Sequence, residues 1–177
     1  MKESIKIVIL GYMGSGKSLV GAELASKLGY TFVDLDLEIE KQEGMMISEL
    51  FQQKGEIYFR KKEIETLKEC IDSKEKMVIA LGGGTPCYGD TMKYLTSNEN
   101  VITFHLRTSI EVLTERLYKQ KTQRPLISHL ETKKALNDFV RKHLFERSSY
   151  YNQATYAIDS TSTSVSEQIH DIVLQLF

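Results

Sequence analysis

The stretch GYMGSGKS, residues 11–18, decides the fold of this chain of 177 residues. It has the spacing G-x-x-x-x-G-K-[ST], follows an apolar run that ends at Leu10, and precedes a helical pattern of apolar residues. Gly11, Gly14 and Gly16 let successive backbone N–H groups surround phosphate oxygens, and the following helix adds the positive end of its dipole. A bare glycine turn is the alternative. The strand before the motif and the helix after it favour a phosphate-binding loop.

This motif predicts a nucleotide site but not what is done with the nucleotide. Lys17 would reach the outer phosphates, and Ser18 would ligate a magnesium ion. The predicted ATP-binding residues of the loop are Gly11, Gly14, Ser15, Gly16, Lys17, Ser18 and Leu19. A GTPase would need the guanine-reading sequence N-K-x-D, which the chain lacks, and a motor would need a longer chain. A small phosphotransferase remains, which requires a second site for its acceptor.

Composition limits the partners of the chain. Its 23 Lys and Arg residues nearly balance 24 Asp and Glu residues, so it offers no broad attraction to nucleic acid or anionic membranes. No apolar run approaches the length of a membrane span or of a secretory signal. Cys70 and Cys87 stand apart and predict free thiols. We expect one domain over residues 1–177, a monomer in the cytoplasm without nucleic-acid or membrane partners.

Short β-branched runs alternate with helical patterns, which predicts an α/β fold with a parallel sheet covered by helices on both faces. The expected strands are residues 5–10, 31–33, 77–81, 101–106 and 155–158. Two helix starts carry capping boxes, Thr108 with Glu111 and Ser164 with Glu167. Ligands of such folds bind at the carboxyl ends of the strands, so residues that follow the strands are candidates for the site.

Two carboxylates, Asp34 and Asp36, follow the second expected strand. Strand alternation would direct both to one face at the edge of the sheet where the phosphates lie. Phosphoryl transfer can use one carboxylate to hold magnesium through water and another to orient a hydroxyl and accept its proton. An acidic first turn of a helix is the alternative. The third strand supplies no aspartate, so Asp34 is the better candidate for the metal and Asp36 for the acceptor.

Three consecutive glycines, Gly82, Gly83 and Gly84, follow the third expected strand. A tight turn is one interpretation of this run. The other is that bare backbone must approach a small polar substrate and donate N–H groups to it.

Two arginines lie where helical periodicity expects an apolar residue. Arg60 interrupts one apolar stripe and Arg147 continues another. The stripes are formed by Ile57, Ile64, Leu67 and Ile71, and by Leu136, Phe139, Val140 and Leu144. Either arginine alone could be a snorkelling side chain or part of a buried ion pair. Together, beside the phosphate loop and the glycines, they indicate a bidentate grip on a carboxylate.

A third arginine, Arg124, precedes a proline in the polar segment 118–131. This segment separates two helical patterns and has the composition of a mobile lid. Arg124 would then swing over the phosphates and stabilise charge during transfer. A loop arginine in solvent is the alternative.

Together these motifs resemble the shikimate kinase family. GYMGSGKS, DLD, GEIYFRKKE, LGGGTP, RPL and ERSSYY occur in the family's order and approximate spacing over nearly the whole chain. The resemblance implies a three-layer P-loop NTPase fold with a five-stranded parallel sheet, a helical acceptor-binding region at about 35–62 and a mobile lid at about 118–131. It also implies transfer of the γ-phosphate of ATP, with Mg²⁺, to the 3-hydroxyl of shikimate, a step of chorismate and aromatic amino acid biosynthesis.

The resemblance also implies a role for each site residue. Shikimate would be bound by Asp36, Arg60, Arg147 and the backbone of Gly82, Gly83 and Gly84, with Phe59 against its ring. Mg-ATP would be handled by Lys17, by Ser18, by Asp34 through water and by the lid residue Arg124. The catalytic set is then Lys17, Asp36 and Arg124. The adenine would meet Arg116 and the polar loop at residues 160–164.

Two other functions compete with this interpretation. A sugar-acid kinase such as gluconate kinase is similar through the P-loop and the order of strands and helices, but the triple glycine and the F-R after D-x-D favour shikimate. A nucleotide-gated binding module without catalysis is the second. Intact Lys17, Asp34 and Asp36 disfavour it, because a module without catalysis has no need of both carboxylates.

Overall fold

The structure is a computed structural model that describes residues 4–177, apart from the side chain of Gln123. Its centre is a sheet of five strands, all parallel, in the order β2-β3-β1-β4-β5. The strands are β1 (Lys6–Leu10), β2 (Thr31–Asp34), β3 (Met77–Ala80), β4 (Val101–Arg107) and β5 (Tyr156–Asp159). Each expected strand is confirmed to within two residues at its ends.

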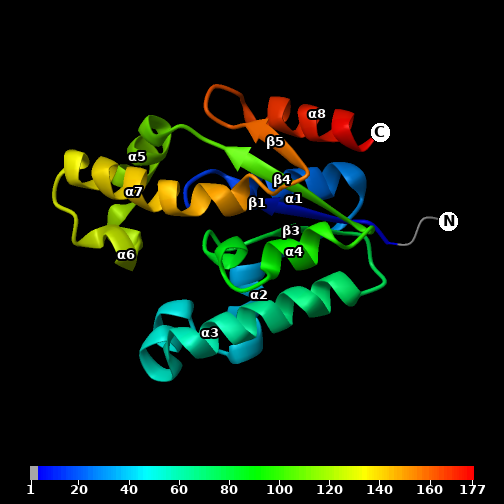
Figure 1. Cartoon of the computed structure of the whole chain (residues 1–177), viewed down its shortest axis with the longest axis horizontal. Coiled ribbons are helices and arrows are strands. Elements are labelled where there is room, and N and C mark those ends of the chain that lie inside the picture. Colours follow the sequence, from blue (N-terminus) through cyan, green and yellow to red (C-terminus); the bar gives the residue numbers. More distant parts are fainter. Residues whose placement is uncertain (1–3) are drawn as a thin grey trace.

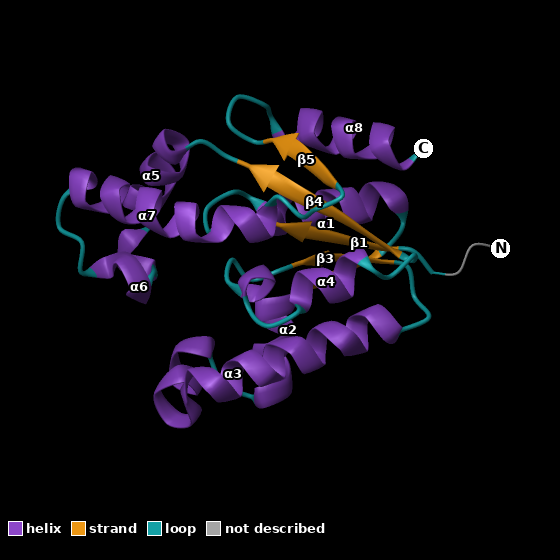
Figure 2. Cartoon of the chain, viewed as in Figure 1, coloured by secondary structure: helices purple, strands orange, loops and turns teal. Residues whose placement is uncertain are grey.

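Helices cover both faces of this sheet (Figures 1 and 2). They are α1 (Lys17–Leu28), α2 (Leu35–Glu43), α3 (Ile47–Asp72), α4 (Thr91–Thr96), α5 (Ile110–Lys119), α6 (Pro125–Ser128), α7 (Lys133–Tyr151) and α8 (Val165–Leu176), with 3₁₀ turns η1 (Thr85–Cys87) and η2 (Lys121–Gln123). No helix among the described residues is long and apolar enough to cross a membrane.

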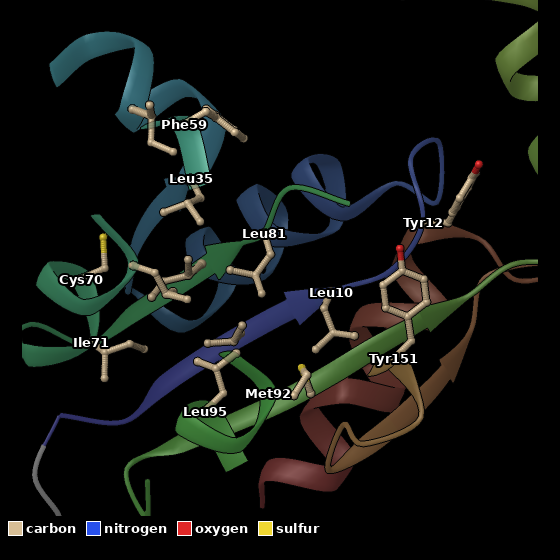
Figure 3. Packing of buried hydrophobic residues seen from close by; sticks show 14 of the residues in the cluster. Leu10, Tyr12, Leu35, Phe59, Cys70, Ile71, Leu81, Met92, Leu95 and Tyr151 are labelled. Carbon is tan, nitrogen blue, oxygen red and sulfur yellow. The ribbon is translucent and has the colours of Figure 1, made fainter. Parts of the chain in front are cut away.

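Alternation along β1 divides the core into two layers. Ile7 and Ile9 pack in one cluster with residues of α1 and α8, whereas Val8 and Leu10 pack in the other with residues of α3, α4 and α7. Figure 3 shows the second cluster. All five residues of β1 are buried, four of them apolar, which confirms a strand covered on both faces.

One of the two expected capping boxes is present and the other is not. The capping box of Ser164 and Glu167 is confirmed at the start of α8. The box expected at Thr108 is wrong: Ser109 caps α5, and its Oγ accepts from the backbone N–H of Val112 at 3.3 Å. The strand before this helix runs on to Arg107, so the helix begins one residue later than its sequence pattern suggested.

The long helix α3 also corrects a prediction. Gly55 interrupts it with φ 80° and ψ 169°, a conformation that favours glycine. After the kink, its buried residues are Phe59, Glu63, Thr66, Leu67, Cys70 and Ile71. Ile57, expected on the inner stripe, is 77% exposed, because it lies two residues after the kink at Gly55 and packs against nothing in the core.

Candidate active site

A cavity of 540 Å³ opens at the carboxyl ends of the strands. Segments that follow β1, β2 and β3 meet there, as expected for a parallel sheet. Its lining includes Gly14, Ser15, Gly16, Lys17, Ser18, Leu19, Asp34, Asp36, Gly82, Gly83, Arg116, Arg124 and Ser160. Most predicted site residues are therefore brought together. The lining does not include Gly11, Arg60, Gly84 and Arg147; Arg60 lies beside Gly84, and Arg147 lies beside Gly83.

The loop after β1 has the backbone that a phosphate site needs. Gly11, Gly14 and Gly16 have φ values of 148°, 80° and 98°, which other residues rarely adopt. Lys17 starts α1, and its Nζ donates to the carbonyl of Tyr12 at 2.9 Å. Burial lowers the pKa of Lys17 to about 8, although Asp36 and Asp34 oppose the shift. A buried cation with a neutral acceptor would gain from a phosphate oxygen.

Ser18 and Asp34 form a pair of oxygen donors beside this loop. The hydroxyl of Ser18 donates to Oδ2 of Asp34 at 2.5 Å. The other oxygen of Asp34 caps α2 by accepting from the backbone N–H groups of Asp36 at 3.1 Å and Leu37 at 3.4 Å. Hydroxyl and carboxylate oxygens fit Mg²⁺. No group of three carboxylate, His or Cys side chains surrounds a common point within the described chain, so phosphates and water would supply the remaining ligands.

Asp36 lies in the first turn of α2, not on a strand. Strand alternation was therefore the wrong reason for placing it beside Asp34, because Asp34 already ends β2 and the helix begins at the next residue. Burial, then the charges of Glu63 and Asp34, raise the pKa of Asp36 from 3.8 to about 6, against Lys17 and Arg60. A partly buried carboxylate with a raised pKa is a suitable proton acceptor.

The three glycines are required by close approach and not by backbone conformation, because none of them has a positive φ. A Cβ atom on Gly82 would lie 2.8 Å from Oδ1 of Asp36, and one on Gly84 would lie 2.9 Å from Nη2 of Arg60. On Gly83 it would lie 3.3 Å from the backbone N of Met13 and 3.7 Å from Nη1 of Arg147. Bare backbone thus lets the phosphate loop, the aspartate and both arginines approach one strand end.

The two arginines differ in their partners. Arg60 Nη1 donates to Glu63 at 2.9 Å, its Nε lies 3.5 Å from Glu56, and its guanidinium lies 4.1 Å from the ring centre of Tyr88. Arg60 therefore forms an ion pair with the buried Glu63, which is one of the alternatives that the sequence analysis gave for this arginine. Arg147 has no carboxylate partner within 4.0 Å among residues 4–177, which leaves its charge available to a ligand.

Glu63 is a site residue that sequence reasoning missed. It is 1% exposed, it accepts from Arg60, and it accepts from the Thr85 hydroxyl at 2.5 Å. Its charge is also a cause of the raised pKa of Asp36. Its position three residues after Arg60, on the same helical face, was the available signal. Acidic residues on helices are mostly exposed, so this signal was weak.

The segment 118–131 contains helical turns in place of an irregular loop. It holds the end of α5, η2 and α6, and Ile127 within it is fully buried. Lys121 Nζ donates to the carbonyl of Leu130 at 3.1 Å, which closes the segment on itself. Arg124 lines the cavity and donates to Oε1 of Gln120 at 3.0 Å, so it faces the phosphate loop.

The far end of the cavity is built by Arg116 and Ser160. Arg116 donates to the carbonyls of Gly14 at 3.2 Å and Ser160 at 3.4 Å. The hydroxyl of Ser160 donates to the carbonyl of Ser15 at 2.9 Å. Both residues therefore join the phosphate loop. Phe59, expected against the acceptor ring, is 4% exposed and packs on Phe51 with ring centres 4.7 Å apart.

A glycine-rich phosphate loop at the centre of a parallel sheet, with a partly buried carboxylate of raised pKa and arginines at the same edge, is the arrangement of a P-loop kinase. The shikimate kinase model matches residues 13–177. The chain is 42% identical over 168 residues to a shikimate kinase of Flavobacterium johnsoniae, covering 95% of this chain and 96% of that one. The chain belongs to the shikimate kinase family and is an ATP-dependent kinase.

Solved structures agree with this family. A shikimate kinase from Bacteroides thetaiotaomicron superposes with a TM-score of 0.88 at 32% identity, covering 97% of this chain and 98% of that one. A shikimate kinase from Acinetobacter baumannii in complex with shikimate gives 0.84 at 30% identity, covering 98% and 93%. A gluconokinase from Sinorhizobium meliloti, at 18% identity and a TM-score of 0.54, shares the fold alone. The P-loop NTPase fold predicted from the sequence is confirmed.

Proposed function

We propose that this kinase transfers the γ-phosphate of magnesium-bound ATP to the 3-hydroxyl of shikimate, giving shikimate 3-phosphate and ADP, as a cytoplasmic monomer. The observation that carries the proposal is the position of Asp36. The charges of Lys17 and of Arg60 both act on its carboxylate, which also lies beside Gly82, the first of the three glycines. An acceptor with a hydroxyl at one end and a carboxylate at the other fits this arrangement.

The nucleotide half of the site has a role for each predicted residue. The backbone N–H groups of the phosphate loop and Lys17 would bind the β- and γ-phosphates. Ser18 and Asp34 would hold the metal, Asp34 through water, and the bound metal would neutralise charge that develops on the phosphates. Arg124 faces the same cavity and would stabilise the moving phosphoryl group.

The acceptor half orients the hydroxyl. Arg147 and Arg60 would bind the shikimate carboxylate, and the backbone of Gly82 to Gly84 would donate to ring hydroxyls. The 3-hydroxyl oxygen would then form a bond to the γ-phosphorus while the bond from that phosphorus to the β–γ bridging oxygen breaks. Asp36 would accept the hydroxyl proton, and ADP would leave with the electron pair of the broken bond.

The test is a panel of acceptors. ADP release from ATP is measured with shikimate, gluconate and nucleoside monophosphates, each with Mg²⁺ and with a chelator. Of the three kinds of acceptor, we expect only shikimate to support ADP release. That activity should be lost when the chelator removes the metal. Equal or greater kcat/KM with gluconate or a nucleoside monophosphate would contradict the proposed acceptor. Full turnover in the chelator would contradict the proposed metal.

A further inference from the structure

Tyr12 is a residue of the phosphate loop whose side chain leaves that loop. Its carbonyl accepts from Lys17, and its ring is 2% exposed. Figure 3 shows it on the loop that follows β1. A buried tyrosine hydroxyl needs a partner, and the partner of Tyr12 comes from far along the chain: Nδ1 of His143, on α7, at 3.0 Å.

On α7, the side chain of Tyr12 meets both His143 and Arg147, the arginine proposed to bind the acceptor. His143 precedes Arg147 by one helical turn, so both lie on one face of the helix. The guanidinium of Arg147 lies 6.0 Å from the ring centre of Tyr12, and the rings of Tyr12 and His143 meet edge to face at 5.6 Å. Tyr12 is thus in contact with a phosphate-binding residue through its main chain and with an acceptor-binding residue through its ring.

The ionisation states of this pair favour a stable hydrogen bond. Burial raises the pKa of Tyr12 far above neutrality, although the charge of Arg147 opposes this, so its hydroxyl keeps its proton. Burial and then Arg147 lower the pKa of His143, against Glu146, so its ring stays neutral near pH 7. The ring of Phe139 packs against the ring of His143, with ring centres 5.1 Å apart, and limits its rotation.

We infer that Tyr12 and His143 are positioning residues of the acceptor site. They keep Arg147 at a fixed distance from the phosphate loop. The inference rests on the proposed function, because it takes Arg147 as a ligand of the acceptor carboxylate. A loop that binds phosphate would then also set the distance between the phosphoryl group and the carboxylate of the acceptor. Without the Tyr12–His143 bond, Arg147 would meet the carboxylate less often, whereas the phosphate-binding backbone would be unchanged.

The experiment measures kcat and both KM values for Tyr12→Phe, His143→Leu and the double variant, with shikimate and ATP as substrates. Loss of one hydrogen bond should raise the KM for shikimate by about 2- to 13-fold, with kcat and the KM for ATP unchanged. The double variant should resemble the single variants, because both remove the same bond. His143→Asn, which can donate or accept near the position of Nδ1, should restore the wild-type KM.

Tyr156→Phe is the matched control. Tyr156 lies on β5 and stacks on Phe104, away from the acceptor residues, so its loss of a hydroxyl should change neither KM. An unchanged KM for shikimate in both single variants, an equal rise in both KM values, or additive effects in the double variant would overturn the inference. Failure of the proposed function would look different, because the wild-type enzyme itself would not phosphorylate shikimate.

Discussion

Among single residues, Asp36 occupies a site that favours its proposed role as proton acceptor and lowers the stability of the fold. Its pKa is about 6 in the folded chain and 3.8 ordinarily, with burial as the first cause. Above pH 6 the carboxylate is charged in both states, and only the folded state bears the cost of burying that charge. Below pH 3.8 it is neutral in both states, so the cost disappears.

Asp36→Asn should therefore raise the free energy of unfolding at pH 7 by ~1–3 kcal/mol, an advantage that disappears below pH 4. It should also lose ~10²- to 10⁴-fold in kcat, because an amide accepts no proton. For the wild type, kcat/KM should fall as the pH drops through about 6, the pKa of Asp36. Denaturant unfolding at both pH values and turnover check these expectations. Lower stability at pH 7, or full turnover, would contradict the role of Asp36.

The alanine variants of Arg60 and Arg147 should both lose shikimate affinity but should differ in stability. Either alanine variant should weaken shikimate binding by about 10- to 150-fold, because a charge-assisted contact is worth ~1.5–3 kcal/mol. Arg60→Ala also leaves Glu63, which is 1% exposed, without its ion-pair partner. That variant should lose ~3–5 kcal/mol of stability, whereas Arg147→Ala should lose little.

Glu63→Gln supplies the control for this comparison. Combined with Arg60→Ala, it removes the unpaired charge, so stability should recover while shikimate affinity stays low. Calorimetric titration with shikimate and thermal unfolding separate the two effects. Unchanged shikimate affinity in an unstable Arg60→Ala variant would mean that Arg60 has only a structural role.

Residue types and spacing were enough to find the donors that follow strands, but not the residues that support them. Asp34 and Asp36 stand in a motif, so their spacing predicted that both lie at the cavity, even though strand alternation was the wrong reason for it. Glu63 lies on the same helix as Arg60, but its burial and its contact with Thr85 depend on other elements, and Tyr88 contacts Arg60 from outside that helix. Such contacts depend on how helices pack, which a local pattern does not contain.

At the scale of elements, a substitution in the turn after β3 should affect acceptor binding without affecting stability. Gly84→Ala would place a methyl group 2.9 Å from Arg60 Nη2, so the guanidinium must move although the backbone of Gly84, at φ −92°, tolerates alanine. The KM for shikimate should rise while the melting temperature stays near that of the wild type.

Gly29→Ala is the opposite control for the turn. Gly29 ends α1 with φ 67° and has open space around it, so alanine there should cost ~1–2 kcal/mol of stability without changing the KM. Both values are read from steady-state kinetics and thermal unfolding. An unchanged KM in Gly84→Ala would show that the close approach to Arg60 does not serve acceptor binding.

The segment 118–131 should act as a lid on the cavity. Its helical turns are short, and Arg124 within it faces the phosphate loop, so ADP and shikimate together should draw it closed. Hydrogen exchange should show higher protection of this segment in the ternary complex than in the free enzyme. Helix α4 serves as the internal control and should not change. Equal protection of the segment in both states would contradict a lid.

Element boundaries were predictable wherever the apolar pattern was regular. All five strands were, because each contains a short run of β-branched or apolar residues, and every residue of β1 and β3 is buried. The stripe on α3 was less so, since Gly55 breaks the helix and leaves Ile57 outside the core. The predicted start of α5 was one residue too early. Thr108 and Ser109 both suit an N-cap, and because β4 continues to Arg107, Ser109 is the residue that caps the helix.

The whole molecule joins parts that are far apart in sequence. The strand order places β3 between β1 and β2, so the phosphate loop, the aspartates and the glycines meet at one edge. The rule that parallel strands present their carboxyl ends together made this much predictable. The bond from Tyr12 to His143 spans 131 positions and was not predictable, because no motif links a phosphate loop to a helix face so distant.

The central claim is that this kinase phosphorylates the 3-hydroxyl of shikimate, and the direct measurement is the structure of the product. Wild-type enzyme is incubated with Mg-ATP and shikimate, and the product is examined by ¹H–³¹P correlation NMR. The account predicts one phosphorylated product, whose phosphorus couples to the proton on carbon 3. Coupling to the proton on carbon 4 or 5, or ADP release without any phosphorylated shikimate, would contradict it.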